Sequence, residues 1–293
     1  MRARFIFNPF SGRNRSNPYL RNRAAEFIRE NRLDAAIVDT ERPRHATELA
    51  AQAVAEGCDL VVAIGGDGTM NEVATALVGT PAVFGLIPCG SGNGLGRHLG
   101  IRRPGHGAFQ TLLTGRPMAI DAGSVNGFSF FNSMGLGLEA DIAVRFSRLT
   151  SRGLAGYVRV GFPAFFAHQP ETLTVRHPAG TAQLRAFTLA VMNSDQYGND
   201  ARVAPGARTD DGRFELISVP QVGFFGACGM LYRLGTDSFD EVKSVVRFSG
   251  PTFAIERAKP GWIHTDGEPR ATTSLLEISL RPKSLRIMVP AEK

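Results

Sequence analysis

One glycine-rich stretch limits the fold of this chain more than any other feature. Residues 65–72 read GGDGTMNE and come directly after the apolar run LVVAI at 60–64. A short apolar run that ends in paired glycines is typical of a central parallel strand and the loop at its carboxyl end, where α/β folds bind ligands. The glycines let backbone N–H groups approach phosphate oxygens, and Asp67 adds a carboxylate beside them. The stretch therefore predicts an α/β fold with a phosphate-binding loop.

The first 120 residues extend this pattern. Segments with helical spacing separate four short apolar runs, at 4–7, 35–38, 60–64 and 83–87. Such an alternation of strands and helices predicts a doubly wound parallel sheet. We assign residues 1–120 to this α/β domain, and we expect the strand-like end of the chain, 284–293, to complete it.

From residue 121 onward the pattern changes to hairpins. Asn126-Gly127 separates two strand-like runs and is a strong signal for a two-residue hairpin turn. A helix-like segment at 156–168 precedes another pair of strand-like runs. We therefore expect a mainly antiparallel second domain over 121–283, with a cleft between the two domains.

Charge and cysteine content narrow the classes of partner. The 33 Lys and Arg exceed the 27 Asp and Glu, which gives a net charge of +6. The arginines are spread thinly and no basic run is interleaved with aromatic residues, so nucleic acid is not expected, whereas nucleotide phosphates and an anionic membrane surface fit better. The three widely spaced cysteines offer neither a disulfide framework nor a zinc site. No apolar run is long enough to span a membrane. We expect a cytoplasmic protein that associates peripherally with membranes.

Two further loops follow predicted strands. NPFSGRNR, at 8–15, supplies a hydroxyl group and guanidinium groups, and PCGSGNGLGRHLG, at 88–100, supplies a second backbone cradle at the start of a helix. The first of these loops is equally an ordinary strand-to-helix turn with a solvated basic rim. For the 65–72 stretch, a tight turn with Asp67 capping the next helix is the alternative, but a cap needs only one of these residues. The 65–72 stretch is neither a P-loop, since no GK[ST] follows, nor a dinucleotide fingerprint, since Asn71 replaces the last glycine.

Acidic loops occur in the expected second domain. APGARTDDGRFE, at 204–215, and HTDGEP, at 264–269, each contain an Asp-Gly turn signal, so a plain hairpin is one interpretation. Glu268 lies between an apolar pair and a proline. A carboxylate held in such a place can accept a proton from a hydroxyl group.

Taken in order, NPFSG, GGDGTMNEV, PCGSGN and DGE resemble the signature of the diacylglycerol kinase catalytic-domain superfamily. These soluble lipid kinases include bacterial diacylglycerol kinases and sphingosine kinases. The resemblance covers nearly the whole chain, whereas GGDGT alone is shared with NAD kinases and phosphofructokinases. It implies an α/β domain followed by a β-sandwich, with ATP in the cleft and Mg²⁺ as a cofactor.

The resemblance also implies roles for individual residues. Nucleotide contacts are implied for Asn8, Pro9, Ser11, Gly12, Arg13, Thr40, Gly65, Gly66, Asp67, Gly68, Thr69, Asn71, Glu72, Ser91, Gly92, Asn93 and Arg148. Glu268 matches the residue usually assigned as the catalytic base in diacylglycerol kinases. Asp67 matches the aspartate usually given that role in sphingosine kinases, so the choice between the two stays open.

Metal and substrate positions follow in the same way. Asp211 matches an aspartate tied to a magnesium site, with backbone oxygens near Arg208 and Arg213 as co-ligands. Relatives commonly have apolar residues at those two positions, so the arginines are a departure from the pattern. Asp121 matches an acidic position of the active-site network. Asp141 matches the sphingosine-kinase acid that meets the lipid head group.

We therefore expect an ATP-dependent kinase that phosphorylates a primary hydroxyl group of a membrane lipid. PCGSGN and Asp141 favour a long-chain base, while diacylglycerol or another lipid alcohol stays open. An NAD kinase and a catalytically silent ATP- or lipid-binding protein are the alternatives of other classes, and a homodimer is left open. The apolar segments 161–168 and 222–232 are interpreted either as ordinary core or as the lining of a lipid pocket.

Overall fold

The computed structural model describes residues 2–15, 19–101, 106–149 and 154–291. The chain forms two compact units. One contains residues 1–120 and 283–293, and the other contains residues 121–282. We describe each unit by itself.

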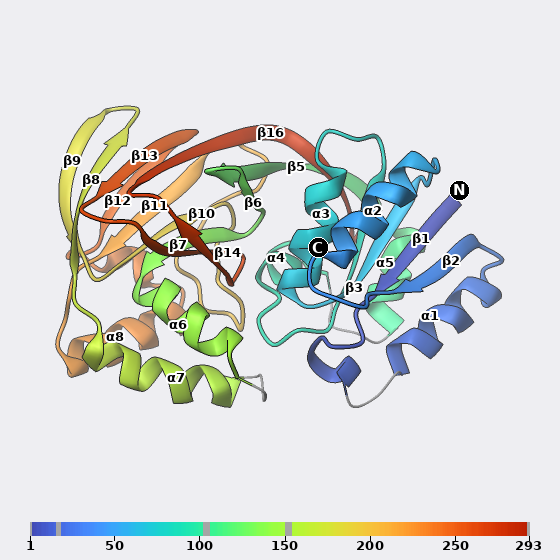
Figure 1. Cartoon of the computed structure of the whole chain (residues 1–293), viewed down its shortest axis with the longest axis horizontal. Coiled ribbons are helices and arrows are strands. Elements are labelled where there is room, and N and C mark those ends of the chain that lie inside the picture. Colours follow the sequence, from blue (N-terminus) through green and yellow to red (C-terminus); the bar gives the residue numbers. More distant parts are fainter. Residues whose placement is uncertain (1, 16–18, 102–105, 150–153, 292–293) are drawn as a thin grey trace. The chain divides into compact units, whose positions relative to one another are not determined.

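The first unit is built on a parallel sheet (Figure 1). Its strands are β1 (Arg2–Phe7), β2 (Asp34–Asp39), β3 (Leu60–Gly65) and β4 (Val83–Pro88), arranged in the order β2-β1-β3-β4, and the end of β16 (Leu275–Val289) pairs with β4 in the parallel sense. Every residue of β3 is buried. This confirms the parallel α/β fold, because an apolar run with no polar face needs helices on both sides.

Helices cover both faces of this sheet. They are η1 (Gly12–Arg15), α1 (Tyr19–Glu30), α2 (His45–Ala55), α3 (Asp67–Leu77), α4 (Gly94–His98) and α5 (His106–Thr114). Phe27 of α1 and Phe109 of α5 pack together on one face, with ring centroids 5.2 Å apart. On the other face, α2 and α3 contact each other and the sheet. The loops after β1, β3 and β4 therefore open at one edge, the carboxyl edge.

The second unit contains two antiparallel sheets (Figure 1). One has the order β12-β11-β10-β7-β14-β15, with bounds Val246–Gly250, Phe214–Val219, Thr188–Met192, Ser133–Gly137, Gly261–Thr265 and Glu268–Thr272. The other contains β16 with β13 (Thr252–Arg257), β8 (Glu171–His177) and β9 (Gly180–Ala186), and β5 (Arg116–Val125) pairs with β16 and β6 (Phe128–Phe130). Buried residues of both sheets form one apolar core. The unit is the expected β-sandwich.

Two hairpins of this unit have two-residue turns with positive φ. Asn126 and Gly127 join β5 to β6 at φ 48° and 84°, and Asp266 and Gly267 join β14 to β15 at φ 49° and 83°. Positive φ at both turn residues suits the twist of the strands, and Asn-Gly and Asp-Gly tolerate it best. The hairpin predicted at Asn126-Gly127 is therefore confirmed.

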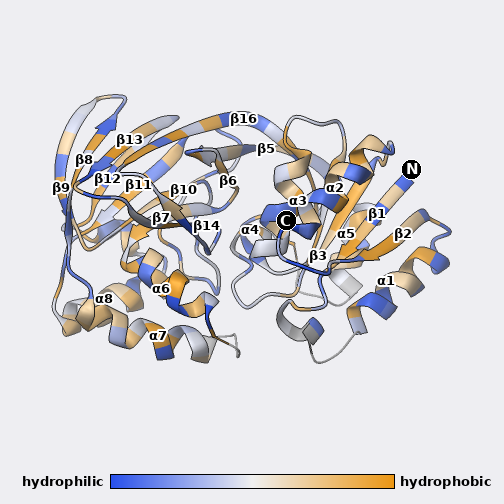
Figure 2. Ribbon diagram, in the orientation of Figure 1, coloured by the Kyte–Doolittle hydropathy of each residue, from blue (hydrophilic) through white to orange (hydrophobic). Residues whose placement is uncertain are grey.

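The second unit also contains the helices α6 (Leu138–Ser147), α7 (Leu154–Ala167), α8 (Phe224–Gly235) and η2 (Phe239–Glu241). The two apolar segments expected to be core or pocket lining lie in α7 and near α8, and no residue of α8 is buried. Phe162, Phe166 and Phe225 are exposed, so these side chains are not core, whereas Ala164 is buried and Met230 packs against a core cluster. Figure 2 shows apolar residues along both helices. Among the described residues, no helix is long and apolar enough to cross a bilayer.

Candidate functional site

The three predicted phosphate loops meet at the carboxyl edge of the first unit's sheet. We call residues 8–12, 65–69 and 89–93 the loop cluster. The Asn8 side-chain amide donates to Thr69 Oγ1 at 2.8 Å, and Ser11 Oγ lies 3.2 Å from the same oxygen. The Gly66 N–H donates to Ser11 Oγ at 3.4 Å. Thr69 thereby ties the first loop to the second.

The third loop joins through Asp67 and Asn93. The Asp67 carboxylate accepts the Asn93 N–H at 3.0 Å, and the buried Asn93 side chain bonds both the N–H and the carbonyl oxygen of Gly90. Asn93 has φ 55°, a left-handed conformation that Asn tolerates. Asp67 is the first residue of α3, and the N-cap residue before it is Gly66, which has no side chain. The Asp67 carboxylate thus holds the neighbouring loop, and the interpretation of it as a plain cap is insufficient.

Glycines let the three loops approach each other. A Cβ on Gly12, which has φ 47°, would lie 2.2 Å from the Cys89 carbonyl oxygen, and a Cβ on Gly90 would lie 2.9 Å from the Gly66 Cα. Real Cβ atoms do not approach backbone atoms so closely. The loops are therefore packed backbone to backbone, as a site that presents N–H groups to an anion requires.

Some of the other predicted nucleotide residues belong to the loop cluster, and others lie outside it. Pro9, Gly68, Ser91 and Gly92 are half-buried within or beside the three loops, and Gly65 and Asn71 are buried. Thr40 is buried at the end of β2, where its N–H bonds the Phe7 carbonyl oxygen at 2.9 Å. The side chain of Arg13 lies outside the described part of the structure. Arg148 is an exposed residue of the second unit, at the end of α6.

Glu72 has a structural partner instead. Its two carboxylate oxygens accept the N–H groups of Arg44 and Ala46, each at 3.1 Å. These N–H groups begin α2, whose first donors have no partner within the helix. Glu72 therefore caps α2, a contact that the sequence pattern did not reveal.

Cys89 lies in the loop cluster as a buried thiol. Burial raises the pKa of the Cys89 thiol to about 12, and the Asp67 carboxylate adds to this rise. A thiol in this state carries no thiolate near neutral pH and is a poor nucleophile. Cys89 is therefore a packing residue of the cluster.

In the second unit, two acids lie on one turn with opposite environments. The buried Asp266 carboxylate accepts backbone N–H groups from three consecutive residues, 131–133, at 2.8–3.0 Å. Glu268, two residues later, is half-buried at the start of β15 and faces Thr265 across the hairpin. Within the described residues, its carboxylate makes no hydrogen bond or ion pair. Asp266 therefore fixes the turn, and Glu268 keeps its carboxylate available.

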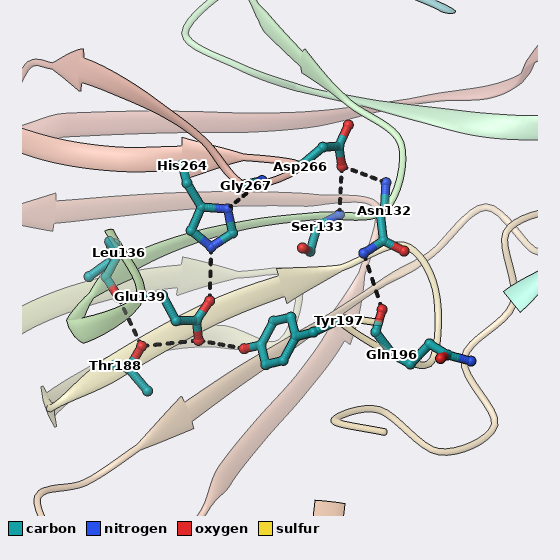
Figure 3. Close-up of polar contacts among 10 residues, drawn as sticks. All are labelled: Asn132, Ser133, Leu136, Glu139, Thr188, Gln196, Tyr197, His264, Asp266 and Gly267. Atoms are coloured by element: carbon teal, nitrogen blue, oxygen red, sulfur yellow. Dashed lines mark hydrogen bonds and ion pairs between the residues drawn. The ribbon is translucent and has the colours of Figure 1, made fainter. Parts of the chain in front are cut away.

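A half-buried acid that the sequence analysis missed lies next to this turn (Figure 3). The Glu139 carboxylate, in the first turn of α6, accepts the Thr188 hydroxyl at 3.0 Å and the Tyr197 hydroxyl, and it lies 3.0 Å from His264 Nε2. We call Glu139, Thr188, Tyr197 and His264 the acid network. Burial raises the pKa of Tyr197 well above its ordinary value, so its hydroxyl stays protonated and donates.

The remaining predicted acids have individual partners. The fully buried Asp121 carboxylate accepts the Gly212 N–H at 2.8 Å, which ties β5 to the 208–213 loop. Asp141 Oδ2 lies 2.6 Å from His168 Nδ1, at the end of α7. The Asp141 side chain is still 42% exposed. Asp141 is therefore accessible but already paired.

The side chains at the predicted metal position have partners within the protein. Asp211 is exposed and accepts the Arg213 N–H at 3.1 Å, while the Arg208 guanidinium pairs with Asp210 at 3.1 Å. Across the described residues, no three acids, histidines or cysteines group closely enough to bind an ion. These side chains offer Mg²⁺ one exposed carboxylate, whereas Mg²⁺ prefers several oxygen ligands, so the metal role of Asp211 stays a prediction.

Comparisons with known families agree with this architecture. A family model described as the diacylglycerol kinase catalytic domain matches residues 2–125. A second, described as the YegS C-terminal NAD kinase beta sandwich-like domain, matches residues 132–289. The two matches follow each other along the chain and cover most of it.

Several curated relatives carry lipid kinase names. The chain is 30% identical to a diacylglycerol kinase of Bacillus subtilis over 221 residues, which are 74% of this chain and 73% of the relative. It is 31% identical to a YegS-like lipid kinase of Chromohalobacter salexigens over 198 residues, which are 66% and 64% of the two chains. A crystal structure of a candidate diacylglycerol kinase from Bacillus anthracis has a TM-score of 0.79 at 20% identity, over 98% of this chain and 96% of that one, and shows the shared fold.

The chain therefore belongs to the diacylglycerol kinase catalytic-domain family, with the YegS-like C-terminal domain. It is a lipid kinase. The resemblance that the sequence motifs indicated is confirmed.

Proposed function

We propose that this lipid kinase transfers the γ-phosphoryl group of ATP to the primary hydroxyl group of a long-chain base. The loop cluster supports the nucleotide part, because its backbone-to-backbone packing suits an anion cradle. Diacylglycerol, the substrate named for several relatives, is the main alternative. Mg²⁺ would accompany ATP with phosphate oxygens among its ligands, and no step is assigned to Asp211.

Glu268 is the proposed base. Phosphoryl transfer needs positioning, charge stabilisation and one group that takes the hydroxyl proton. Within the described residues, the Glu268 carboxylate makes no hydrogen bond or ion pair, whereas Asp67 is bonded to the Asn93 N–H. This difference carries the choice of Glu268, and Asp67 then orients the nucleotide loops.

The test is a kinase assay with labelled ATP and a panel of sphinganine, diacylglycerol and NAD. We expect lipid phosphorylation, and we expect Glu268→Gln to lower kcat by roughly 10² or more while the fold is kept. Asp67→Asn should lower kcat/KM for ATP. Wild-type turnover in Glu268→Gln would remove it as the base, phosphorylation of NAD would indicate an NAD kinase, and no transfer to any acceptor would indicate a silent binding protein.

The choice of lipid depends on Asp141. A long-chain base carries an ammonium group beside its hydroxyl group, and the partly exposed Asp141 carboxylate can pair with it. Asp141→Asn should lower kcat/KM about ten-fold or more for sphinganine and hardly change it for diacylglycerol. His168→Gln is the matched control, since it removes the present partner of Asp141 and keeps the carboxylate. Equal losses on both lipids, or wild-type preference for diacylglycerol, would contradict the long-chain-base proposal.

Peripheral membrane binding belongs to the same proposal. Phe162 and Phe166 of α7 contact Phe224 of α8, and Phe225 is 87% exposed beside them. Between Asp141 and Glu171 the sequence has four arginines and no acid, and the α8 segment has one arginine and no acid. Two helices that carry exposed apolar residues, arginines and no acid of their own suit an anionic lipid surface, although Arg233 of α8 is paired with Glu241.

Sedimentation with phosphatidylglycerol vesicles measures this binding. Phe225→Ser should weaken it, and Tyr19→Ser, which changes an exposed aromatic residue of α1, is the control. Binding should also fall as salt rises. Vesicle binding that changes neither with salt nor with Phe225→Ser would contradict the proposal. If the protein forms a dimer that Phe225→Ser dissociates, the apolar face of α7 and α8 binds a second copy of the chain instead.

A further inference from the structure

The turn that precedes Glu268, at Asp266 and Gly267, is held by a second hydrogen bond besides those of the Asp266 carboxylate. The Gly267 N–H donates to Nδ1 of His264, three residues earlier, at 3.3 Å (Figure 3). An N–H group can only donate, so Nδ1 must accept and the ring proton must lie on Nε2. The bond crosses the hairpin immediately before Glu268. The tautomer of His264 therefore helps to set the backbone conformation at Glu268.

Glu139 enforces this tautomer. Its carboxylate is an acceptor for every partner, and the His264 Nε2–H lies 3.0 Å from Oε2. Only 7% of the His264 side chain and 17% of the Glu139 side chain are exposed, so water competes little with this contact. A carboxylate that accepts from Nε2 leaves Nδ1 free to accept the Gly267 N–H.

Gly135 makes the contact possible. It pairs with His264 across β7 and β14, and a Cβ at this position would lie 2.3 Å from Glu139 Oε2 and 2.6 Å from His264 Nε2. No side chain larger than hydrogen fits between the acid and the ring. The arrangement thus depends on close packing of Gly135 of β7 against Glu139 of α6 and His264 of β14.

We propose that His264 is a positioning residue for Glu268: Glu139 holds the imidazole as the Nε2–H tautomer, and Nδ1 fixes the turn that presents the Glu268 carboxylate. This inference rests on the proposed role of Glu268 as the base. It assigns no proton transfer to His264 itself. Misplacement of a reacting group by about 1 Å can cost roughly 10² in rate, so the bond is expected to act on kcat.

Two substitutions at His264 separate its two bonds. In His264→Asn the side-chain oxygen lies where Nδ1 was and can accept the Gly267 N–H, while the contact with Glu139 is lost. In His264→Gln the terminal amide lies where Nε2 was and can donate to Glu139, while the acceptor for Gly267 is lost. Glu139→Gln is a third variant, because an amide that donates to Nε2 forces the other tautomer and removes the acceptor at Nδ1.

The experiment measures kcat, KM for ATP and Tm for these variants, for Glu268→Gln, and for the double variant His264→Gln with Glu268→Gln. We expect His264→Gln and Glu139→Gln to lower kcat roughly ten- to a hundred-fold at unchanged KM for ATP, and His264→Asn to recover most of this loss. The double variant should be no slower than Glu268→Gln alone, since His264 acts through Glu268.

The outcomes distinguish this inference from the proposed function. Full activity of Glu268→Gln would overturn the role of Glu268. Loss in Glu268→Gln together with equal activities of His264→Asn and His264→Gln, or with a further loss in the double variant, would overturn the positioning role alone. If His264→Gln does not fold, Glu139→Gln measured against His264→Asn tests the same role, because equal kcat values would again contradict it.

Discussion

The loop cluster of the first unit and the acid network of the second unit are built from different groups. The loop cluster uses backbone groups, short polar side chains and glycines, and its three loops approach so closely that a Cβ on Gly12 would clash with the Cys89 carbonyl oxygen. The acid network uses carboxylate, hydroxyl and imidazole groups of side chains from α6, β10, β14 and the segment after β10. The loop cluster therefore depends on glycines, which have no Cβ. The acid network depends on side chains from several elements that meet at one place.

This difference matters for how each site tolerates change. A glycine cradle fails when a side chain is added, whereas a carboxylate network fails when a side chain is removed or its hydrogen-bonding capacity is altered. Substitutions of both kinds can therefore test this contrast.

The largest effect is expected at Asp266. Asp266→Ala leaves three buried backbone N–H groups of residues 131–133 without their acceptor, so the free energy of unfolding should fall on the order of 4 kcal/mol. Asp266→Asn should lose less, because it keeps one oxygen. Urea unfolding measures both. Glu268→Gln, on the same turn, should unfold within about 0.5 kcal/mol of wild type, and a loss as large as that of Asp266→Ala would remove the distinction between the two acids.

An added methyl group tests the loop cluster. Gly12→Ala places a Cβ against the Cys89 carbonyl oxygen at positive φ, so the free energy of unfolding should fall by about 2 kcal/mol and the KM for ATP should rise. Gly79→Ala is the control, because Gly79 has φ 76° with nothing within 4 Å of its Cβ position. It should cost about 1 kcal/mol or less and keep KM. Equal changes in the free energy of unfolding and in the KM for ATP for the two variants would show that close packing of the loops contributes to neither.

The smallest effect concerns the thiol in the loop cluster. Burial raises the pKa of Cys89 to about 12, so at pH 8 this thiol stays protonated and should react slowly with a thiol reagent. Cys58 is buried and Cys228 is exposed on α8. Native protein should therefore show one fast-reacting thiol, which Cys228→Ser removes. Fast labelling of Cys89 at pH 8, identified by peptide mapping, would mean that the cluster opens readily.

Much of the first unit could be predicted from sequence because its signals are local. Short apolar runs indicate the strands β1, β3 and β4, and the loops after them contain the residues that meet around Thr69 and Asp67. The carboxyl ends of parallel strands share one edge, so the meeting of these loops follows from topology. Glu72 is the exception, because the same short motif contains a residue that faces a different helix.

The second unit was harder to predict in detail. Glu139 and His264 are 125 residues apart, and nothing in the spacing of either one indicates the other. The signals that existed were indirect: an acid after GLGL and a histidine before DGE. The apolar segments of α7 and α8 have the composition of core or pocket lining, because hydropathy records the preference of a residue for burial and does not record whether a partner covers it.

The sequence alone predicts the Asn126-Gly127 hairpin and the three loops that could bind phosphate, because each of these depends on residues within a few positions of one another. The fold class and the family follow from how such local patterns succeed one another along the chain. Which acids already accept hydrogen bonds and which are available depends on how distant segments fold together. Asp266 and Glu268 are two residues apart and chemically alike, yet one accepts three backbone N–H groups and the other makes no hydrogen bond or ion pair within the described residues. That distinction arises from how β14 and β15 pack beside residues 131–133, since the environment of a carboxylate is set by the atoms that fold around it.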